Sequence, residues 1–323
     1  MKIRRLFALA ALSLALPGWA AAASAADFPR HESRLLVPFP AGGPTDVIGR
    51  IVAQGLDKKW DKPIVVENKP GAGTMIGTAT VAKAPPDGHT FGMVISAYTI
   101  NPAIRSNMPY DTLNDLTGIT QLARANMALV AAKEVPFDTL QELIDYARAH
   151  PGELTYATPG PGTATHLAGE MFKKEAGVDI IHVPYNGSGP ALTDLLGGRV
   201  HLMFDIVHSV RPHLENGKLK IIALTAGEPD PTLPEVPLVK STLPGFEVYS
   251  TIGLVAPAAT PKPIVDKIQH DVADVLATPE VRERFAALGI IPVGSTPDEW
   301  NAFIKSEIER WTKVAQENNI RID

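Results

Sequence analysis

The sequence predicts an α/β protein folded into two lobes that are joined by two extended crossings. Short β-rich runs alternate with amphipathic stretches over most of the chain, which is typical of parallel sheets covered by crossover helices. Strand-like runs at residues 117–122 and 127–132 follow each other with no helical pattern between them, which indicates a first crossing between lobes. A proline-rich connector at residues 228–244 then precedes a strand that would return the chain. The expected parts are a first lobe from residues 27–124 and 248–323, and a second lobe from residues 125–247.

The first residues have the pattern of a secretory signal peptide. Lys2, Arg4 and Arg5 are followed by an apolar run at residues 6–16 and by small residues up to Ala26. The apolar run is shorter than the ~20 residues that span a bilayer. We therefore expect residues 1–26 to be removed during export to the periplasm.

Composition excludes several classes of function. The chain of 323 residues has a formal net charge of −5 and no stretch in which Lys and Arg cluster with aromatic residues, so no nucleic-acid partner is expected. Cysteine is absent, which excludes disulfides, a thiol nucleophile, a thiolate metal site and a lipidated cysteine. A hydrophobic fraction of 45% is enough to build large cores instead.

The first lobe is predicted to begin with repeated strand, loop and helix units. Thr45 is expected to be the N-cap of the first helix, and Asp46 stands where a negative charge favours the helix dipole. The expected elements are strands at 34–39, 63–67, 90–96 and 117–122, and helices at 45–60 and from about 74 to 84.

The second lobe and the C-terminal region continue the alternation. In the last helix Trp300, Phe303, Ile304, Ile308, Trp311 and Val314 recur at helical spacing, which predicts a stripe facing the core. The expected strands are 127–132, 154–157, 180–184, 200–204, 219–225 and 247–257, and the expected helices are 139–149, 164–176, 190–196, 264–276, 280–288 and 299–318.

Several strand-to-helix loops are rich in glycine and each opens a helix. Glycine allows backbone N–H groups to approach a ligand, and a helix N-terminus offers unpaired donors with a partial positive charge. Two such loops fall in each lobe, at residues 41–43, 71–74, 160–163 and 186–189. Because open parallel sheets bind ligands at the carboxyl ends of their strands, we expect a small anion to be held between the lobes. Hinge closure around it suits this architecture.

Side chains near these loops complete the predicted site. The hydroxyls of Thr158, Thr163 and Ser188 suit a carboxylate, whereas for Thr45 and Thr74 a helix cap is slightly favoured over a ligand contact. Asp205 follows a buried strand, where it could act as a base, meet a substrate amine or cap the next helix. The predicted ligand-binding residues are Phe39, Ala41, Gly42, Gly43, Asp46, Thr74, Thr158, Gly160, Gly162, Thr163, His166, Asn186, Ser188 and Asp205.

Nucleotide binding and catalysis are disfavoured by spacing. The glycines at 71, 73 and 77 are one residue too far apart for the dinucleotide fingerprint, and no Gly-Lys-Ser/Thr follows a glycine loop. His166 and Glu170 do not make a zinc site by themselves, and Ser188 lacks the glycine frame of a nucleophile elbow. We expect no metal, no cofactor and no enzymatic activity.

Several motifs in order resemble the Bug-type family, the periplasmic solute receptors of tripartite tricarboxylate transporters. The motifs are Val37-Pro-Phe-Pro-Ala-Gly-Gly-Pro-Thr-Asp46, Val66-Glu-Asn-Lys-Pro-Gly-Ala-Gly73, Pro85-Pro-Asp-Gly88, His166-Leu-Ala-Gly-Glu170, Val183-Pro-Tyr185 and Asp194-Leu-Leu-Gly-Gly198. The resemblance implies a type II-like periplasmic-binding-protein (Venus flytrap) fold with two crossover strands, and delivery of a small carboxylate to membrane permease subunits. It also implies that the loops at residues 40–46 and 158–163 grip the ligand carboxylate, largely by backbone amides and ordered water.

The sequence departs from the family pattern at two positions. Thr74 stands where another glycine is frequent, and Asn186 stands where a lysine is common. The second change removes a cation beside the expected site, which makes a ligand with several carboxylates less secure. An aromatic acid is also open, because Phe39, Tyr98 and Tyr185 could line the pocket.

The leading hypothesis is therefore a monomeric periplasmic receptor for a monocarboxylate, a dicarboxylate or an acidic amino acid. For an amino acid, Asp46 or Asp205 would meet the ammonium group. The alternatives are a receptor of the same fold that signals to a membrane sensor and, less favoured by the motifs, an exported hydrolase.

Overall fold

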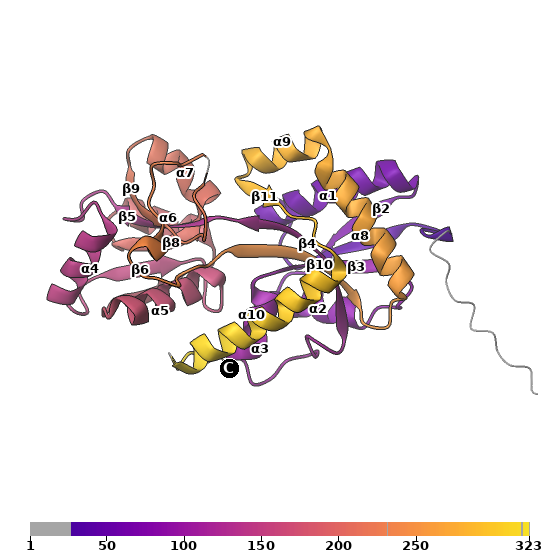
Figure 1. Cartoon of the computed structure of the whole chain (residues 1–323), viewed down its shortest axis with the longest axis horizontal. Helices are drawn as coiled ribbons and strands as arrows, with labels where there is room; N and C mark the ends of the chain where they lie inside the picture. The colour runs from indigo at the N-terminus through magenta and orange to yellow at the C-terminus, as the bar shows by residue number, and fades with distance from the viewer. Residues whose placement is uncertain (1–26, 231, 318, 323) are drawn as a thin grey trace, which may run out of the picture.

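The computed structural model describes residues 27–230, 232–317 and 319–322, so the predicted signal peptide lies outside the described residues. The chain forms two α/β lobes, each built on its own sheet (Figure 1). Within the described ranges, none of the helices combines the length and the apolar character needed to cross a membrane.

The first lobe has three layers around a six-stranded sheet. Strand order is β11-β4-β10-β3-β1-β2, and β1, β2 and β3 are parallel. Apolar side chains of α1, α8 and α9 cover one face, and those of α2 and α10 cover the other. The elements are β1 (Ser33–Val37), α1 (Pro44–Trp60), β2 (Ile64–Asn68), α2 (Met75–Ala82), β3 (Thr90–Ile95), α3 (Ala97–Ile104), β4 (Leu116–Ala125), β10 (Ser250–Pro257), α8 (Lys262–Ala277), α9 (Pro279–Ala287), β11 (Ile290–Pro292) and α10 (Pro297–Glu317).

The second lobe is built on a five-stranded sheet of order β7-β6-β8-β5-β9. Its core is the largest cluster of buried apolar side chains in the described structure. The elements are β5 (Met127–Ala132), α4 (Leu140–Ala149), β6 (Thr155–Thr158), α5 (Ala164–Ala176), β7 (Ile181–Pro184), α6 (Ser188–Leu196), β8 (Leu202–Ile206), α7 (Val207–Glu215) and β9 (Leu219–Leu224).

Both sheets are mixed rather than purely parallel, which differs from the prediction. Strand β10 runs antiparallel to β3 and β4, and β5 runs antiparallel to β8 and β9. A chain that leaves one sheet and later returns to it enters in the reverse direction, so the crossings themselves introduce the antiparallel strands. The expectation of two α/β lobes with two crossover strands is confirmed.

The first crossing takes a single residue. Strand β4 pairs in the first sheet as far as Ala125, β5 pairs in the second sheet from Met127, and Asn126 lies between them. Its amide donates to the Asp230 carboxylate at 2.9 Å. The crossing therefore contains no loop, and a buried hydrogen bond anchors it.

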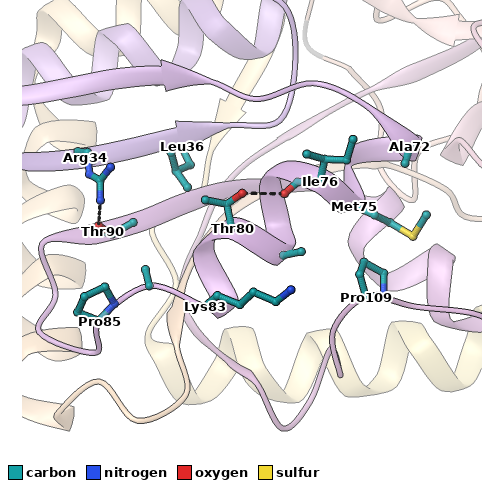
Figure 2. Close-up of a pocket in the computed structure, with 12 residues that line it drawn as sticks. Arg34, Leu36, Ala72, Met75, Ile76, Thr80, Lys83, Pro85, Thr90 and Pro109 are labelled. Atoms are coloured by element: carbon teal, nitrogen blue, oxygen red, sulfur yellow. Dashed lines mark hydrogen bonds between the residues drawn. The ribbon is translucent and has the colours of Figure 1, made fainter.

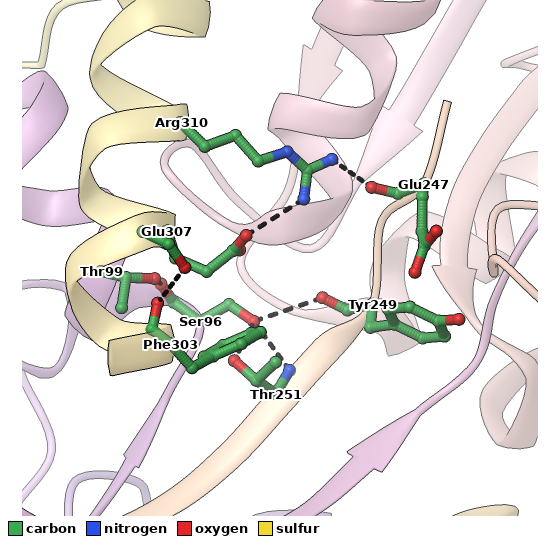
Figure 3. A network of polar contacts seen from close by, with 9 residues as sticks. Ser96, Thr99, Glu247, Tyr249, Thr251, Phe303, Glu307 and Arg310 are labelled. Carbon is green, nitrogen blue, oxygen red and sulfur yellow. Dashed lines mark hydrogen bonds and ion pairs between the residues drawn. The ribbon is translucent and has the colours of Figure 1, made fainter. Parts of the chain in front are cut away.

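The second crossing runs into β10 and is fastened to α3 and α10 (Figure 3). The Ser96 hydroxyl lies 3.1 Å from the Thr251 hydroxyl and accepts the Thr251 N–H at 2.8 Å. Arg310 of α10 donates to the Glu247 carbonyl and pairs with Glu307 at 3.2 Å. These contacts tie the returning strand to two helices at once.

The last helix contacts both cores. Trp300 and Ile304 pack under the first sheet, whereas Trp311 and Ala315 belong to the core of the second lobe. The predicted apolar stripe is therefore buried as expected, but it serves two lobes in succession. In Figure 1, α10 runs beneath the crossover strands towards the second lobe.

Candidate ligand-binding site

A cavity of about 230 Å³ lies between loops of the two lobes. Loops after β1 and β2, helix α3 and the loop after β6 all contribute to it. The lining residues are Pro38, Phe39, Pro40, Pro70, Gly71, Gly73, Thr74, Ile95, Ala97, Asn101, Arg105, Pro161, Gly162 and Thr163. Four predicted ligand residues, Phe39, Thr74, Gly162 and Thr163, are among them.

Asp46 organises the loop that precedes α1. Its buried carboxylate accepts the Gly42 N–H at 2.8 Å, the Arg50 guanidinium at 2.9 Å and the Asn68 amide at 2.9 Å. The Arg50 hydrogen bond, helped by those of Gly42 and Asn68 and opposed by burial, lowers the pKa of Asp46 to about 2. These three donors hold the carboxylate in place, so Asp46 shapes the loop that precedes α1.

The start of α1 leaves backbone donors unused. Gly43, not Thr45, is the N-cap, since the helix begins at Pro44. The predicted Thr45 cap is therefore wrong, because Pro44 suits the first helical position. Among the described residues, the N–H groups of Gly43 and Thr45 donate to no protein acceptor. Ala41 and Gly42 are exposed beside them.

The loop before α2 holds an unusual backbone. Ala72, Gly73 and Thr74 all have positive φ, at 47°, 63° and 78°. Two of these residues are not glycine, and such backbone strain is concentrated at binding sites. Thr74 occupies the N-cap position of α2, yet within the described structure its side chain makes no capping bond. The hydroxyl is thus available at the cavity that Thr74 lines.

The hydroxyls of the loop after β6 are used within the loop. Thr163 donates to the Gly160 carbonyl at 2.7 Å and accepts the His166 N–H at 3.2 Å, which makes it the N-cap of α5. Thr158 bonds to His182 Nε2 at 2.7 Å. Within the described ranges, the N–H groups of Gly160 and Thr163 donate to no protein acceptor. The hydroxyls of Thr158 and Thr163, predicted to contact the ligand, are therefore hydrogen-bonded within the protein.

The stacked imidazole rings of His166 and His182 contact the loop after β6. His166 and His182 lie 4.3 Å apart between ring centroids, and His166 Nδ1 accepts the Gly162 N–H at 3.2 Å. A backbone N–H can only donate, so this bond requires Nδ1 to be unprotonated. Burial lowers the pKa of both rings, and that of His182 falls to about 4.

This arrangement predicts that acid weakens the protein through the histidine pair. The folded pKa of His182, about 4, lies below its unfolded value of 6.5, so its contribution is present above pH 6.5 and is lost as the pH falls towards 4. Denaturant titrations should show that the free energy of unfolding falls by about 1–3 kcal/mol over that pH window. This loss should be absent in His182→Gln. His270→Gln, which changes an exposed histidine of α8 away from this pair, should retain the loss. Identical profiles for wild type and His182→Gln would contradict the assignment.

The loop after β7 lies against the loop after β6. The Gly187 N–H donates to the Pro159 carbonyl at 2.8 Å, and Tyr185 N–H donates to the Thr158 carbonyl at 3.0 Å. Asn186 is exposed and Ser188 begins α6 half-buried. Neither lines the cavity.

Asp205 is buried at the end of β8 with half of its carboxylate unsatisfied. Oδ1 accepts the N–H of Ile206 at 2.8 Å, whereas Oδ2 finds no hydrogen-bond partner within the described structure. Burial raises the pKa of Asp205 to about 6. The nearby Ser188 hydroxyl opposes this shift, although it completes no hydrogen bond to Oδ2. Asp205 does not line the cavity, and α7 has Ile206 as its N-cap, so the capping interpretation is wrong.

Sequence reasoning missed the part of the site that comes from α3. Ala97, Asn101 and Arg105 line the cavity, but no helix was predicted there because Pro102 interrupts its eight residues. The available signal was position, since this segment follows the carboxyl end of β3 as the glycine loops follow their strands. Strand β11 was missed as well, being only three residues long.

The tyrosines considered for an aromatic ligand are engaged elsewhere. Tyr98 is buried under the first sheet and donates to the Thr112 carbonyl at 2.8 Å. Tyr185 donates to the Asp194 carboxylate at 2.8 Å. Of the three aromatic candidates, Phe39 alone lines the cavity.

A larger cavity, of about 600 Å³, lies beneath α2 in the first lobe, apart from the cavity between the lobes (Figure 2). Its floor is apolar, with Leu36 and Met75, and Arg34 and Lys83 supply its cations. The glycine loops of the second lobe take no part in it, so the smaller cavity between the lobes is the better candidate site. In the described part of the chain, no group of three His, Cys, Asp or Glu side chains is placed to hold a metal ion.

Comparison with known proteins places the chain in a family. A model of the tripartite tricarboxylate transporter family receptor matches residues 48–320. The chain belongs to this family. Protein BugT of Bordetella pertussis, a curated relative, is 34% identical over 325 residues that cover 100% of both chains. The Bug-type resemblance predicted from the motifs is thereby confirmed.

Solved structures of similar proteins confirm the two-lobed solute-binding fold of this receptor family. The R. palustris protein Rpa4515 with adipate is 35% identical, with a TM-score of 0.83, over 91% of this chain and 99% of its own. MatC from Rhodopseudomonas palustris with bound malate is 34% identical, with a TM-score of 0.78, over 89% and 99%. The periplasmic binding protein BugD is 33% identical, with a TM-score of 0.79, over 91% and 99%. The matched family is one of transporter receptors, and BugD is described as a periplasmic binding protein.

Proposed function

We propose that this protein is a periplasmic receptor that captures a small carboxylate between its lobes and delivers it to the membrane subunits of a tripartite transporter. The observation that carries the proposal is the pair of helix N-termini whose loops meet at one cavity. Pro38, Phe39 and Pro40 lead towards α1, Pro161, Gly162 and Thr163 lead into α5, and both sets line the same space.

The chemistry of these two termini suits a carboxylate. Backbone N–H groups at residues 43, 45, 160 and 163 have no protein acceptor within the described structure, and each helix N-terminus has a partial positive charge. A carboxylate accepts several such hydrogen bonds at once. Thr74, with an uncommitted hydroxyl, adds a neutral donor.

Most other predicted site residues have a supporting role in this proposal. Asp46, Thr158, Thr163 and His166 fix the two loops by hydrogen bonds, and closure of the lobes would bring the loop that begins at Asn186 towards the ligand. Adipate and malate, bound by two similar proteins, are acids of the kind proposed. Export by residues 1–26, monomeric action and the absence of any cofactor belong to the same proposal.

Calorimetry tests the proposal. The mature protein would be unfolded, dialysed and refolded to remove any bound ligand, then titrated with dicarboxylates, monocarboxylates, acidic amino acids, aromatic acids and uncharged sugars. We expect binding confined to acids. Binding of a sugar, or of no acid by protein shown to be folded, would contradict the proposal.

A further inference from the structure

Arg105 is the one ionisable side chain among the described residues that line the cavity between the lobes. It follows the last residue of α3 and is half-buried. The rest of the lining is proline, glycine, alanine, isoleucine, phenylalanine, threonine and asparagine. The electrostatic character of this cavity therefore depends on a single guanidinium group together with the backbone dipoles.

The guanidinium is held in place from one side. Arg105 Nε donates to Asn101 Oδ1 at 3.1 Å, and Asn101 Nδ2 donates to the Gly73 carbonyl at 2.9 Å. A Cβ atom added to Gly73 would lie 3.2 Å from Arg105 Nη2, so the guanidinium rests against the loop before α2. The φ of +63° at Gly73 favours glycine, and a side chain there would crowd the guanidinium.

Among the described residues, the other N–H donors of Arg105 have no hydrogen-bond partner. A guanidinium has five N–H donors in a fixed plane, and one of them is used by Asn101. Within residues 27–230, 232–317 and 319–322, no carboxylate forms an ion pair with Arg105. A half-buried cation that has no carboxylate partner among the described residues is matched well by a bidentate anion from outside the chain.

We propose that Arg105 makes the receptor selective for ligands with a second anionic group, that is, for short dicarboxylates over monocarboxylates. The inference rests on the proposed function. The backbone donors of α1 and α5 hold one carboxylate, and Arg105 pairs with the other beside the loop before α2. A volume of about 230 Å³ limits the ligand to a short chain. Arg105 thereby supplies, from the first lobe, a cation that Asn186 does not supply from the second.

Calorimetry with matched ligands tests the selectivity. The ligands form two pairs, succinate with succinamate and adipate with adipamate. In the second member of each pair, a neutral amide of the same shape replaces one carboxylate. For the pair that binds more tightly, we expect the wild type to bind the diacid ~10-fold or more tightly than the half-amide. Arg105→Met should weaken the diacid by ~10–100-fold and its half-amide by less than about threefold. Arg105→Lys should restore part of the diacid affinity, because it keeps the charge but not the planar fork.

Arg282→Met is the control, since it removes the same charge from an exposed position on α9. It should leave both affinities unchanged, and circular dichroism should show every variant to be folded. Equal losses for diacid and half-amide, or no loss, would overturn the role of Arg105 while the receptor function stands. Absence of acid binding in the wild type would overturn both.

Discussion

Asp46→Asn should weaken ligand binding by ~10–100-fold and lower the free energy of unfolding by about 2 kcal/mol at pH 7. The carboxylate holds the Gly42 N–H, Arg50 and Asn68 together, so the isosteric amide would present an N–H₂ group to donors. The loop that positions the α1 donors would then lose its fixed shape. Calorimetry and urea unfolding on the same preparations measure the two effects.

The pH dependence of this effect has a defined sign. The folded pKa of Asp46, about 2, lies below the unfolded value of 3.8, so its contribution is present above pH 3.8 and is lost as the pH falls through 2. The stability gap between wild type and Asp46→Asn should therefore narrow in that window. Asp61→Asn removes the same charge at the exposed C-cap of α1 and should change stability by less than ~0.5 kcal/mol. A similar loss in Asp61→Asn would show that charge, not the loop network, is responsible.

Asp205→Asn should have the opposite effect and stabilise the ligand-free protein by about 1–3 kcal/mol at pH 7. Burial raises the folded pKa of Asp205 to about 6, above the unfolded value of 3.8. The penalty for the ionised group is absent below pH 3.8, grows as the pH rises to 6 and is complete above 6. Unfolding measured at pH 4 and pH 7 should show the gain only at the higher pH.

The same variant separates two roles for Asp205. If its unsatisfied oxygen serves the ligand site, the stabilised variant should bind more weakly, which is the usual relation between a strained functional group and stability. Unchanged affinity with increased stability would assign the carboxylate to the second lobe alone. A loss of stability at pH 7 would contradict its description as a buried charge with an unpaired oxygen.

The fold was predictable because its elements carry strong local patterns. Helix α5 and strand β5 have the predicted bounds, and most other elements agree within a few residues. The exception with consequences is α3, where Pro102 and a short length conceal the helix. Sheet direction was also not predictable from local pattern, because the antiparallel pairing of β10 follows from where the chain returns.

The site was predictable in outline but not in the roles of its side chains. Glycine loops identified the helix N-termini, since glycine spacing is visible in sequence. That Thr163 and Asp46 hold the loops depends on hydrogen bonds between neighbours in space, such as Asp46 with Asn68. Arg105 reaches the cavity through a helix that the pattern conceals, so no loop motif includes it.

The central claim is that the backbone N–H groups at the starts of α1 and α5 hold one ligand carboxylate from both lobes. Backbone amide NMR of the refolded protein, titrated with the acid selected by calorimetry, tests it most directly. We predict the largest ligand-induced shifts at Gly43 and Thr45 in the first lobe and at Gly160 and Thr163 in the second. Shifts confined to one lobe, or centred on the cavity beneath α2, would contradict the claim.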